Sequence, residues 1–362
     1  CSPRPESAVR MSTPSTSSYL QVTDLHVAFP TADGMVQAVN GVTFSVDKGQ
    51  TLAIVGESGC GKSVTSLAIM GLHNRKVAQI SGSVVVNDAD KGAVDIVAAP
   101  EDTVRSLRGR AISMIFQDPM SSLHPYYTVG DQVAEAYLLH HDVSKEEAFA
   151  QAVKALERVG IPEAERRAKN FPHEFSGGMR QRAMIAMALV NDPVMVIADE
   201  PTTALDVTVQ AQIINLLRGL QAEFGMAIII ITHDLGVVAD IADDVAVMYG
   251  GRIVEQANVR EVFYHPQMPY TMGLLSSVPR LDGGREERLR TIPGQPPSMI
   301  NLPQGCAFRV RCPYVEMVGG DTCATTLPEL ADGGNNHLVR CHLNADTRKR
   351  LSAEALNRQG AM

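Results

Sequence analysis

The feature that most constrains this chain is an apolar run, a glycine-rich loop and a helical segment that follow one another without a gap. The apolar run TLAIV spans residues 51–55, GESGCGKS follows over residues 56–63, and helical periodicity continues to Gly71. A glycine-rich turn between a buried strand and a helix directs successive backbone N–H groups at one point, and the helix N-terminus favours an anion there. The match to G-x-x-x-x-G-K-[ST] in this context predicts a phosphate-binding P-loop.

Each residue type in this loop has a chemical reason to be there. Glycines allow the backbone to turn toward the β-phosphate, Lys62 neutralises the β- and γ-phosphates, and the Ser63 hydroxyl is a ligand for Mg²⁺. The alternative is a chance glycine loop before a helix. The predicted ATP-binding residues of the loop are Gly56, Glu57, Ser58, Gly59, Cys60, Gly61, Lys62, Ser63 and Val64.

A second apolar run, VMVIADE, ends in two acids, Asp199 and Glu200. An acid at the carboxyl end of a strand beside the P-loop strand can hold Mg²⁺, and the next acid can polarise an attacking water. We therefore predict Asp199 as a magnesium ligand and Glu200 as the catalytic base. The alternative is an ordinary solvated strand end.

The rest of the chain reads as an α/β protein with an appended region. Residues 20–46 alternate as an antiparallel hairpin, residues 129–182 are mostly helical, and a helix over residues 207–224 stops at Gly225. Strands that alternate with helices predict a parallel sheet covered by helices. From Pro266 the composition turns to Pro, Gly and Arg, which predicts a domain boundary there.

Composition excludes some classes of protein. The net charge is −8 and the pI is about 5.7, which gives no whole-chain electrostatic case for nucleic-acid binding. No apolar run approaches the roughly 20 residues of a membrane-spanning helix, so a membrane role requires a partner. The first residues are rich in Ser, Thr and Pro and read as a disordered leader.

Five separated motifs occur in the order found in ATP-binding cassette (ABC) ATPases: GESGCGKS, FQDP, FSGGMRQR, VMVIADEPTTALD and ITHD. The resemblance covers about residues 20–262. It implies a P-loop ABC nucleotide-binding domain with a RecA-like core, an antiparallel β subdomain and a helical subdomain. The expected organisation is a disordered leader (1–18), an ABC ATPase domain (19–265, helical subdomain about 120–185), a cysteine-containing extension (266–345) and a tail (346–362).

The resemblance also implies roles for residues outside the P-loop. Two cassettes of this family face each other head to tail, so the turn at Ser176, Gly177 and Gly178, with Met179 and Gln181 alongside, closes over the ATP of the partner cassette. Gln117 senses the γ-phosphate and Mg²⁺, and His233 orients the attacking water with Glu200. Asp206 communicates across the interface. Phe29 resembles the aromatic that stacks on adenine, with a core aromatic as the alternative.

Cys306, Cys312, Cys323 and Cys341 gather in the extension. Four thiolates can hold a [4Fe–4S] cluster or Zn²⁺, and His342 could replace one ligand in a zinc site. A similar tail in the peptide-importer branch carries an iron–sulfur cluster, which the resemblance therefore implies here; reduced buried cysteines are the alternative.

PHEFSGGMRQR, FQDPMSSLHP and GCAFRVRCP look closest to the peptide-importer branch. The resemblance implies the ATPase subunit of a bacterial importer for di- or oligopeptides, peripheral on the cytoplasmic face of the cell membrane. Its expected partners are a second cassette, homologous or identical, two transmembrane permease subunits and an extracellular substrate-binding protein. The rival hypotheses are nickel or another small solute as cargo, and a soluble ABC ATPase that acts on nucleic acid or ribosomes.

Overall fold

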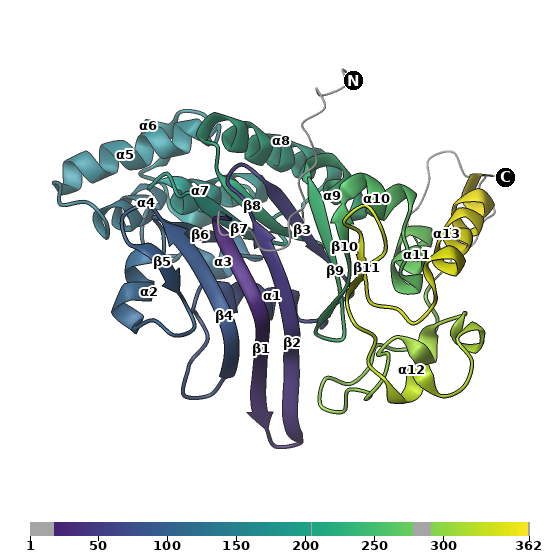
Figure 1. Ribbon diagram of the computed structural model, residues 1–362. Coiled ribbons are helices and arrows are strands. Elements are labelled where there is room, and N and C mark those ends of the chain that lie inside the picture. Colours follow the sequence, from purple (N-terminus) through teal and green to yellow (C-terminus); the bar gives the residue numbers. More distant parts are fainter. Residues whose placement is uncertain (1–17, 204, 278–290, 361–362) are drawn as a thin grey trace.

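The computed structural model describes residues 18–203, 205–277 and 291–360, without the side chains of 356–360. Of the expected leader (1–18), residues 1–17 lie outside the described residues. Two sheets with helices around them make up the described part of the chain (Figure 1).

The first sheet is antiparallel and has the strand order β2-β1-β4-β5. The predicted hairpin forms its centre, because Thr31 at the end of one strand pairs with Gly34 at the start of the next. Leu20 and Val22 are fully buried, as alternation requires, and a register shift between Val22 and Leu25 puts the odd-numbered Val27 in the core as well. The strands of this sheet are β1 (Leu20–Thr31), β2 (Gly34–Val46), β4 (Gln79–Asp88) and β5 (Gly92–Asp95).

The second sheet has the order β11-β12-β10-β9-β3-β8-β7-β6. The strands from β9 to β6 pair in parallel, which places the carboxyl ends of the P-loop strand and the acidic strand at one edge. Parallel strands covered on both faces are apolar throughout, and each of these is buried along its whole length. They are β3 (Thr51–Val55), β6 (Ile112–Ile115), β7 (Met195–Asp199), β8 (Ala227–Ile231) and β9 (Asp244–Tyr249).

Two cores lie on the two faces of β3. Leu52 and Ile54 belong to the core shared with the antiparallel sheet, whereas Ala53 and Val55 belong to the core shared with the helices. The period of two along a strand produces this division, and it fixes the P-loop between the two cores.

The helices cover the second sheet, and those between residues 119 and 189 gather at one side of the molecule, at the upper left of Figure 1. The longest of the cassette helices ends at Gly225, whose φ of 62° is left-handed, as the sequence predicted. The cassette helices are α1 (Lys62–Ile69), α2 (Glu101–Leu107), α3 (Pro119–Ser122), α4 (Val129–Leu138), α5 (Lys145–Arg158), α6 (Ala164–Arg167), η1 (Pro172–Glu174), α7 (Gly177–Leu189), α8 (Val207–Phe224), α9 (Leu235–Ile241) and α10 (Val259–Tyr264). None of the helices in the described ranges is long and apolar enough to cross a membrane.

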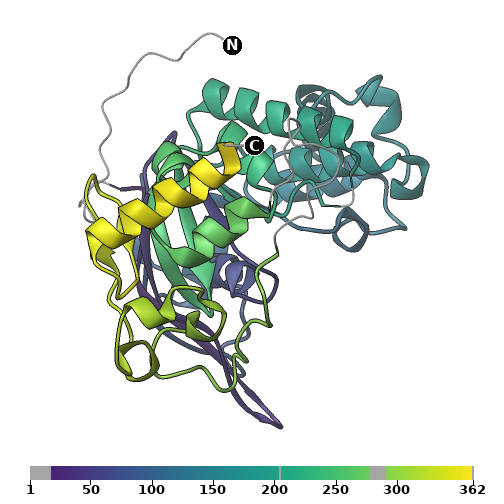
Figure 2. The same ribbon diagram turned by 90° about the vertical axis from the view of Figure 1, so that its right-hand side faces the viewer.

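The extension continues the second sheet. Its strand β12 pairs with β10 through Glu255 and Val339, and helix α13 lies across α11 (Figure 2). The pair of His337 and Glu255, both fully buried, also joins it to the cassette, with 2.6 Å between Nε2 and Oε1. The remaining elements are β10 (Arg252–Asn258), α11 (Pro269–Ser276), η2 (Arg309–Arg311), η3 (Val315–Met317), α12 (Thr322–Thr325), β11 (Ala331–Asp332), β12 (Leu338–Val339) and α13 (Ala345–Gly360).

Candidate nucleotide-binding site

The loop at residues 56–63 has the backbone that a phosphate cradle needs. Gly56 and Gly61 adopt φ angles of 152° and 104°, which side chains rarely allow. A Cβ atom at Gly56 would lie 2.3 Å from Met248 O, and one at Gly61 would lie 2.3 Å from Ala38 O. These two positions therefore require glycine both for conformation and for space.

Lys62 lies at the centre of this loop. Its side chain is buried, and Nζ donates to Gly56 O at 2.8 Å and to Glu57 O at 3.1 Å. The buried thiol of Cys60 lies 3.9 Å from the same Nζ, and burial raises the pKa of this thiol in spite of the nearby cation. The loop thus holds a cation where phosphate charge would be neutralised.

Ser63 and Asp199 meet at the carboxyl edge of the parallel strands. Ser63 Oγ donates to Asp199 Oδ1 at 3.1 Å. Burial raises the pKa of Asp199, and the Ser63 hydrogen bond partly offsets that rise. A hydroxyl beside a buried carboxylate is a ligand set that suits Mg²⁺, because a divalent cation would stabilise the negative charge that burial disfavours.

Glu200 is at the centre of a second group of side chains. Gln117 Nε2 donates to Glu200 Oε2 at 3.1 Å, and Thr203 Oγ1 donates to the same oxygen at 2.8 Å. His233 Nδ1 lies 3.6 Å from the other carboxylate oxygen. Glu200 itself has a φ of 46°. Three predicted residues therefore lie together, and the sequence analysis missed Thr203, although it follows Glu200 by only three positions.

The turn at Ser176 begins helix α7. Ser176 Oγ accepts from Met179 N at 3.3 Å, and a Cβ atom at Gly178 would lie 2.9 Å from Val209 Cγ1. Gln181 is buried, and its Nε2 has no hydrogen-bond partner within the described ranges. Across those ranges, no hydrogen bond joins this turn to the P-loop of the same chain. The chain therefore carries the two predicted phosphate contacts at separate places.

Two other predicted residues have local contacts. Asp206 Oδ1 accepts from Thr208 N and Val209 N at 3.1 and 3.0 Å, so it caps helix α8. Phe29 packs edge-on against His73, with 5.4 Å between the ring centroids. Asp206 and Phe29 therefore each make a contact within the cassette.

Comparison with known proteins identifies the family. Residues 39–203 match the family model described as ABC transporter, and residues 254–317 match the oligopeptide/dipeptide transporter C-terminal region. The oligopeptide transport ATP-binding protein OppD of Escherichia coli K12 is 56% identical over 295 residues, which cover 82% of this chain and 86% of that protein. The chain belongs to the ABC transporter family of ATP-binding proteins.

Other relatives and solved structures support the same family assignment. OppD of Haemophilus influenzae is 50% identical over 327 residues, 90% of this chain and 98% of that protein. Among solved structures, a dimeric post-hydrolysis state of the cassette MJ0796 with ADP and Pi matches with a TM-score of 0.59 and 25% identity, covering 67% of this chain and 99% of that one. The CbiO1 cassette of Clostridium perfringens matches with a TM-score of 0.57 and 30% identity, covering 69% and 92%. The expected ABC cassette fold is confirmed.

The extension of this ABC protein brings its four cysteines into one region. Cys306 N donates to Cys323 O at 2.9 Å, and all four thiols are free. Burial, strengthened by the charges of neighbouring thiols, raises the pKa of Cys306 to about 11 and that of Cys312 to about 12. Burial also raises the pKa of Cys323 and of Cys341. Among the residues described, no three His, Cys, Asp or Glu side chains stand as a ready site for a metal ion.

Sequence reasoning also missed two contacts that join the extension to the P-loop. Tyr270 Oη accepts from Glu57 N at 2.9 Å, and Arg311 forms a bidentate ion pair with the Glu57 carboxylate. The Arg311 contact spans 254 positions of the chain, and no local sequence pattern identifies such a pair.

Proposed function

We propose that this chain is the ATP-hydrolysing subunit of a bacterial importer for di- or oligopeptides. The observation that carries the cargo class is the match of residues 254–317 to the oligopeptide/dipeptide transporter C-terminal region. OppD relatives that align over most of both chains support the same cargo. ATP hydrolysis by the cassette supplies the energy for transport.

The hydrolytic step uses the group around Glu200. Glu200 accepts a proton from the attacking water, while Gln117 and Thr203 hold its carboxylate by the hydrogen bonds described above. His233, on the other side of the carboxylate, orients the water. Lys62 neutralises phosphate charge. Ser63 and Asp199 would hold Mg²⁺, which would neutralise further charge on the phosphate oxygens.

Closure of two cassettes completes each site. Ser176, Gly177, Gly178 and Gln181 of one copy contact the nucleotide that the P-loop of the other copy holds. The similar MJ0796 cassette is a dimer in its post-hydrolysis state with ADP and Pi, which supports this arrangement. Because phosphoryl transfer depends on positioned charge, a site divided between two copies makes hydrolysis depend on closure.

The partners are a second cassette, two transmembrane permease subunits and an extracellular substrate-binding protein, with this chain peripheral on the cytoplasmic face of the membrane. A tagged Glu200→Gln variant, with ATP and Mg²⁺, should recover two multi-span proteins and a peptide-binding protein from detergent-solubilised source membranes. Recovery of a nickel- or sugar-binding protein would retain the importer and change the cargo. Soluble nucleic-acid or ribosomal partners without any membrane protein would refute the importer.

We also propose that Cys306, Cys312, Cys323 and Cys341 hold a [4Fe–4S] cluster. Anaerobic purification should give a brown protein with about four irons and four sulfides per chain. Cys312→Ser should lower the iron content, whereas Cys60→Ser, which changes a cysteine outside the extension, should leave it unchanged. A colourless protein loaded with zinc would contradict the cluster.

A further inference from the structure

The P-loop residue Glu57 is held from two sides: Lys62 of the cassette bonds its carbonyl oxygen, and the extension bonds its carboxylate and its backbone N–H. Its carboxylate pairs with Arg311 through two hydrogen bonds, NH1 to Oε2 at 2.7 Å and NH2 to Oε1 at 2.9 Å. Its backbone N–H donates to the hydroxyl of Tyr270 at 2.9 Å. Both partners come from beyond residue 265, so the extension fixes the side chain and the main chain of one residue in the phosphate loop.

The side chain of Arg311 has all of its hydrogen-bond donors satisfied. A guanidinium has five N–H donors, and each of those of Arg311 meets an acceptor. Besides the two bonds to Glu57, NH1 donates to Tyr249 Oη at 3.3 Å, Nε donates to Pro293 O at 2.9 Å, and NH2 donates to Ile292 O at 3.4 Å. A planar donor group with every hydrogen bond satisfied has one orientation, which makes it a rigid support.

The surroundings of Arg311 strengthen the pair. Its side chain is 5% exposed and that of Glu57 is 25% exposed, so solvent screens the pair only weakly. The guanidinium carbon lies 5.8 Å from the centre of the Tyr249 ring and 6.0 Å from that of Phe308. The hydrogen bonds to Glu57 raise the pKa of Arg311, so it stays charged.

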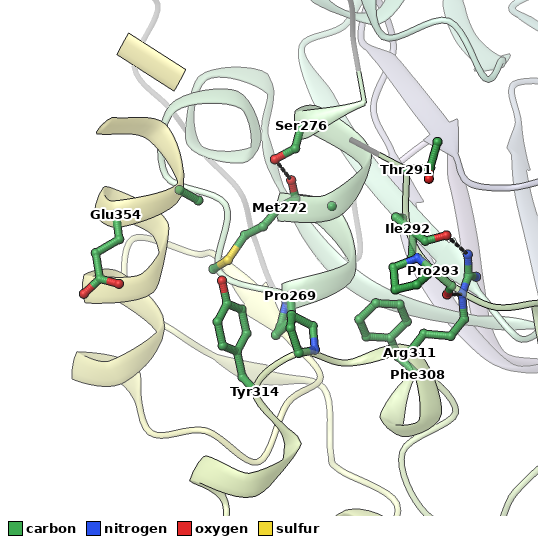
Figure 3. Close-up of a pocket in the computed structure, with 13 residues that line it drawn as sticks. Pro269, Met272, Ser276, Thr291, Ile292, Pro293, Phe308, Arg311, Tyr314 and Glu354 are labelled. Carbon is green, nitrogen blue, oxygen red and sulfur yellow. Dashed lines mark hydrogen bonds between the residues drawn. The ribbon is translucent and has the colours of Figure 1, made fainter. Parts of the chain in front are cut away.

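The short helix η2, which carries Arg311, is itself held by contacts within the extension. In Figure 3, Arg311 lies beside Phe308 and Pro293 at one wall of a cavity of about 190 Å³ between α11, α13 and the segment from Thr291. Arg311 N donates to Phe308 O at 2.9 Å, and Cys312 N donates to Arg309 O at 3.3 Å. The path from this short helix to the phosphate loop therefore consists of one rigid side chain.

We propose that Arg311 is a positioning residue for nucleotide binding, which holds Glu57 so that the backbone N–H groups of the P-loop are preorganised for phosphate. The ATP affinity of the cassette then depends on the extension. This inference rests on ATP binding alone and not on the cargo, so its test is independent of the importer's identity.

The test uses the full chain with Arg311→Gln. Titration with Mg²⁺ and the non-hydrolysable analogue AMP-PNP should give a Kd raised about 10-fold, because a charge-assisted hydrogen-bonded pair that orients the loop is lost. In ATPase assays, the KM for ATP should rise by a similar factor while kcat stays within about twofold, as for a loss of uniform binding. Arg311→Lys, which keeps the charge but not the fork, should raise the Kd by a smaller factor of about three.

Two comparisons separate positioning from a structural role. Glu57→Gln should raise the Kd, and adding Arg311→Gln to it should change the Kd by less than about twofold, because the two residues act through one contact. Arg309→Gln removes a cation from the same short helix and should leave the Kd unchanged. Additive effects in the double variant, or an Arg311→Gln protein with a lower melting temperature but an unchanged Kd, would overturn the proposal.

Discussion

At the scale of single residues, Glu200 has the most demanding position. Its backbone is left-handed, with a φ of 46°, and hydrogen bonds from Gln117 and Thr203 hold its carboxylate in one orientation. Glu200→Gln preserves the shape of this side chain but removes the proton acceptor. We expect kcat to fall by about 10²- to 10⁴-fold while the Kd for ATP changes little.

Phosphate release measures kcat, and equilibrium ATP binding measures the Kd for ATP. Glu165→Gln, a change at an exposed glutamate of helix α6, is the matched control and should retain wild-type ATP binding. Normal turnover in the Glu200→Gln protein would mean that another group is the catalytic base.

Asp244 predicts a dependence of stability on pH. Burial, with the charge of Asp243 adding to it, raises the pKa of Asp244 from 3.8 to about 6, although Gln50 donates a hydrogen bond to this carboxylate. Because the folded pKa lies above the unfolded one, the contribution of Asp244 to stability is fully present below pH 4. It is lost as the pH rises through 6.

Asp244→Asn should therefore raise the melting temperature more at pH 8 than at pH 5. The free energy of unfolding should increase by about 1–2 kcal/mol at the higher pH. Thermal unfolding at both pH values measures this difference, with Asp102→Asn, at an exposed carboxylate of helix α2, as the control. An equal effect of Asp244→Asn at the two pH values would contradict the sign of the shift.

At the scale of elements, the sequence predicted the strands whose residue pattern is contained within one short segment of the chain. Alternation predicted the hairpin of β1 and β2, and apolar runs predicted β3 and β7. The short strands β5 and β6 carry too few residues for a periodic signal, and the pairing of β12 with β10 depends on register between distant segments. The same limit applies to the site, since Tyr270 and Arg311 reach Glu57 across more than two hundred positions.

The pairing of β12 with β10 is reinforced by a buried charged group. Glu255 is fully buried, and its Oε1 contacts His337 at 2.6 Å and Gln267 N at 2.5 Å, while its Oε2 has no hydrogen-bond partner within the described ranges. His337→Ala should destabilise the protein by about 3 kcal/mol, because it leaves a buried carboxylate poorly satisfied.

Urea unfolding measures this loss, and His342→Ala, at a less buried histidine of the same extension, should cost under about 1 kcal/mol. A His337→Ala protein whose urea midpoint matches that of His342→Ala would mean that β12 pairing does not depend on the buried pair.

At the scale of the whole molecule, the two predicted phosphate contacts of this chain are at different places. The P-loop follows β3, whereas the Ser176 turn begins α7 in the helical group at the upper left of Figure 1. We predict that a chain built in this way has two half-sites and that a second copy completes each of them.

Mixing two inactive variants tests this division directly. Lys62→Ala disables the P-loop and Ser176→Arg disables the turn, so each homodimer should lack turnover. In a mixed dimer, the intact P-loop of the Ser176→Arg copy faces the intact turn of the Lys62→Ala copy, which leaves one working site. Equal mixing should therefore restore about a quarter of wild-type ATPase activity, since about half of randomly formed dimers are mixed and each has one of two sites. If both contacts served the same site within one chain, the mixture would stay inactive.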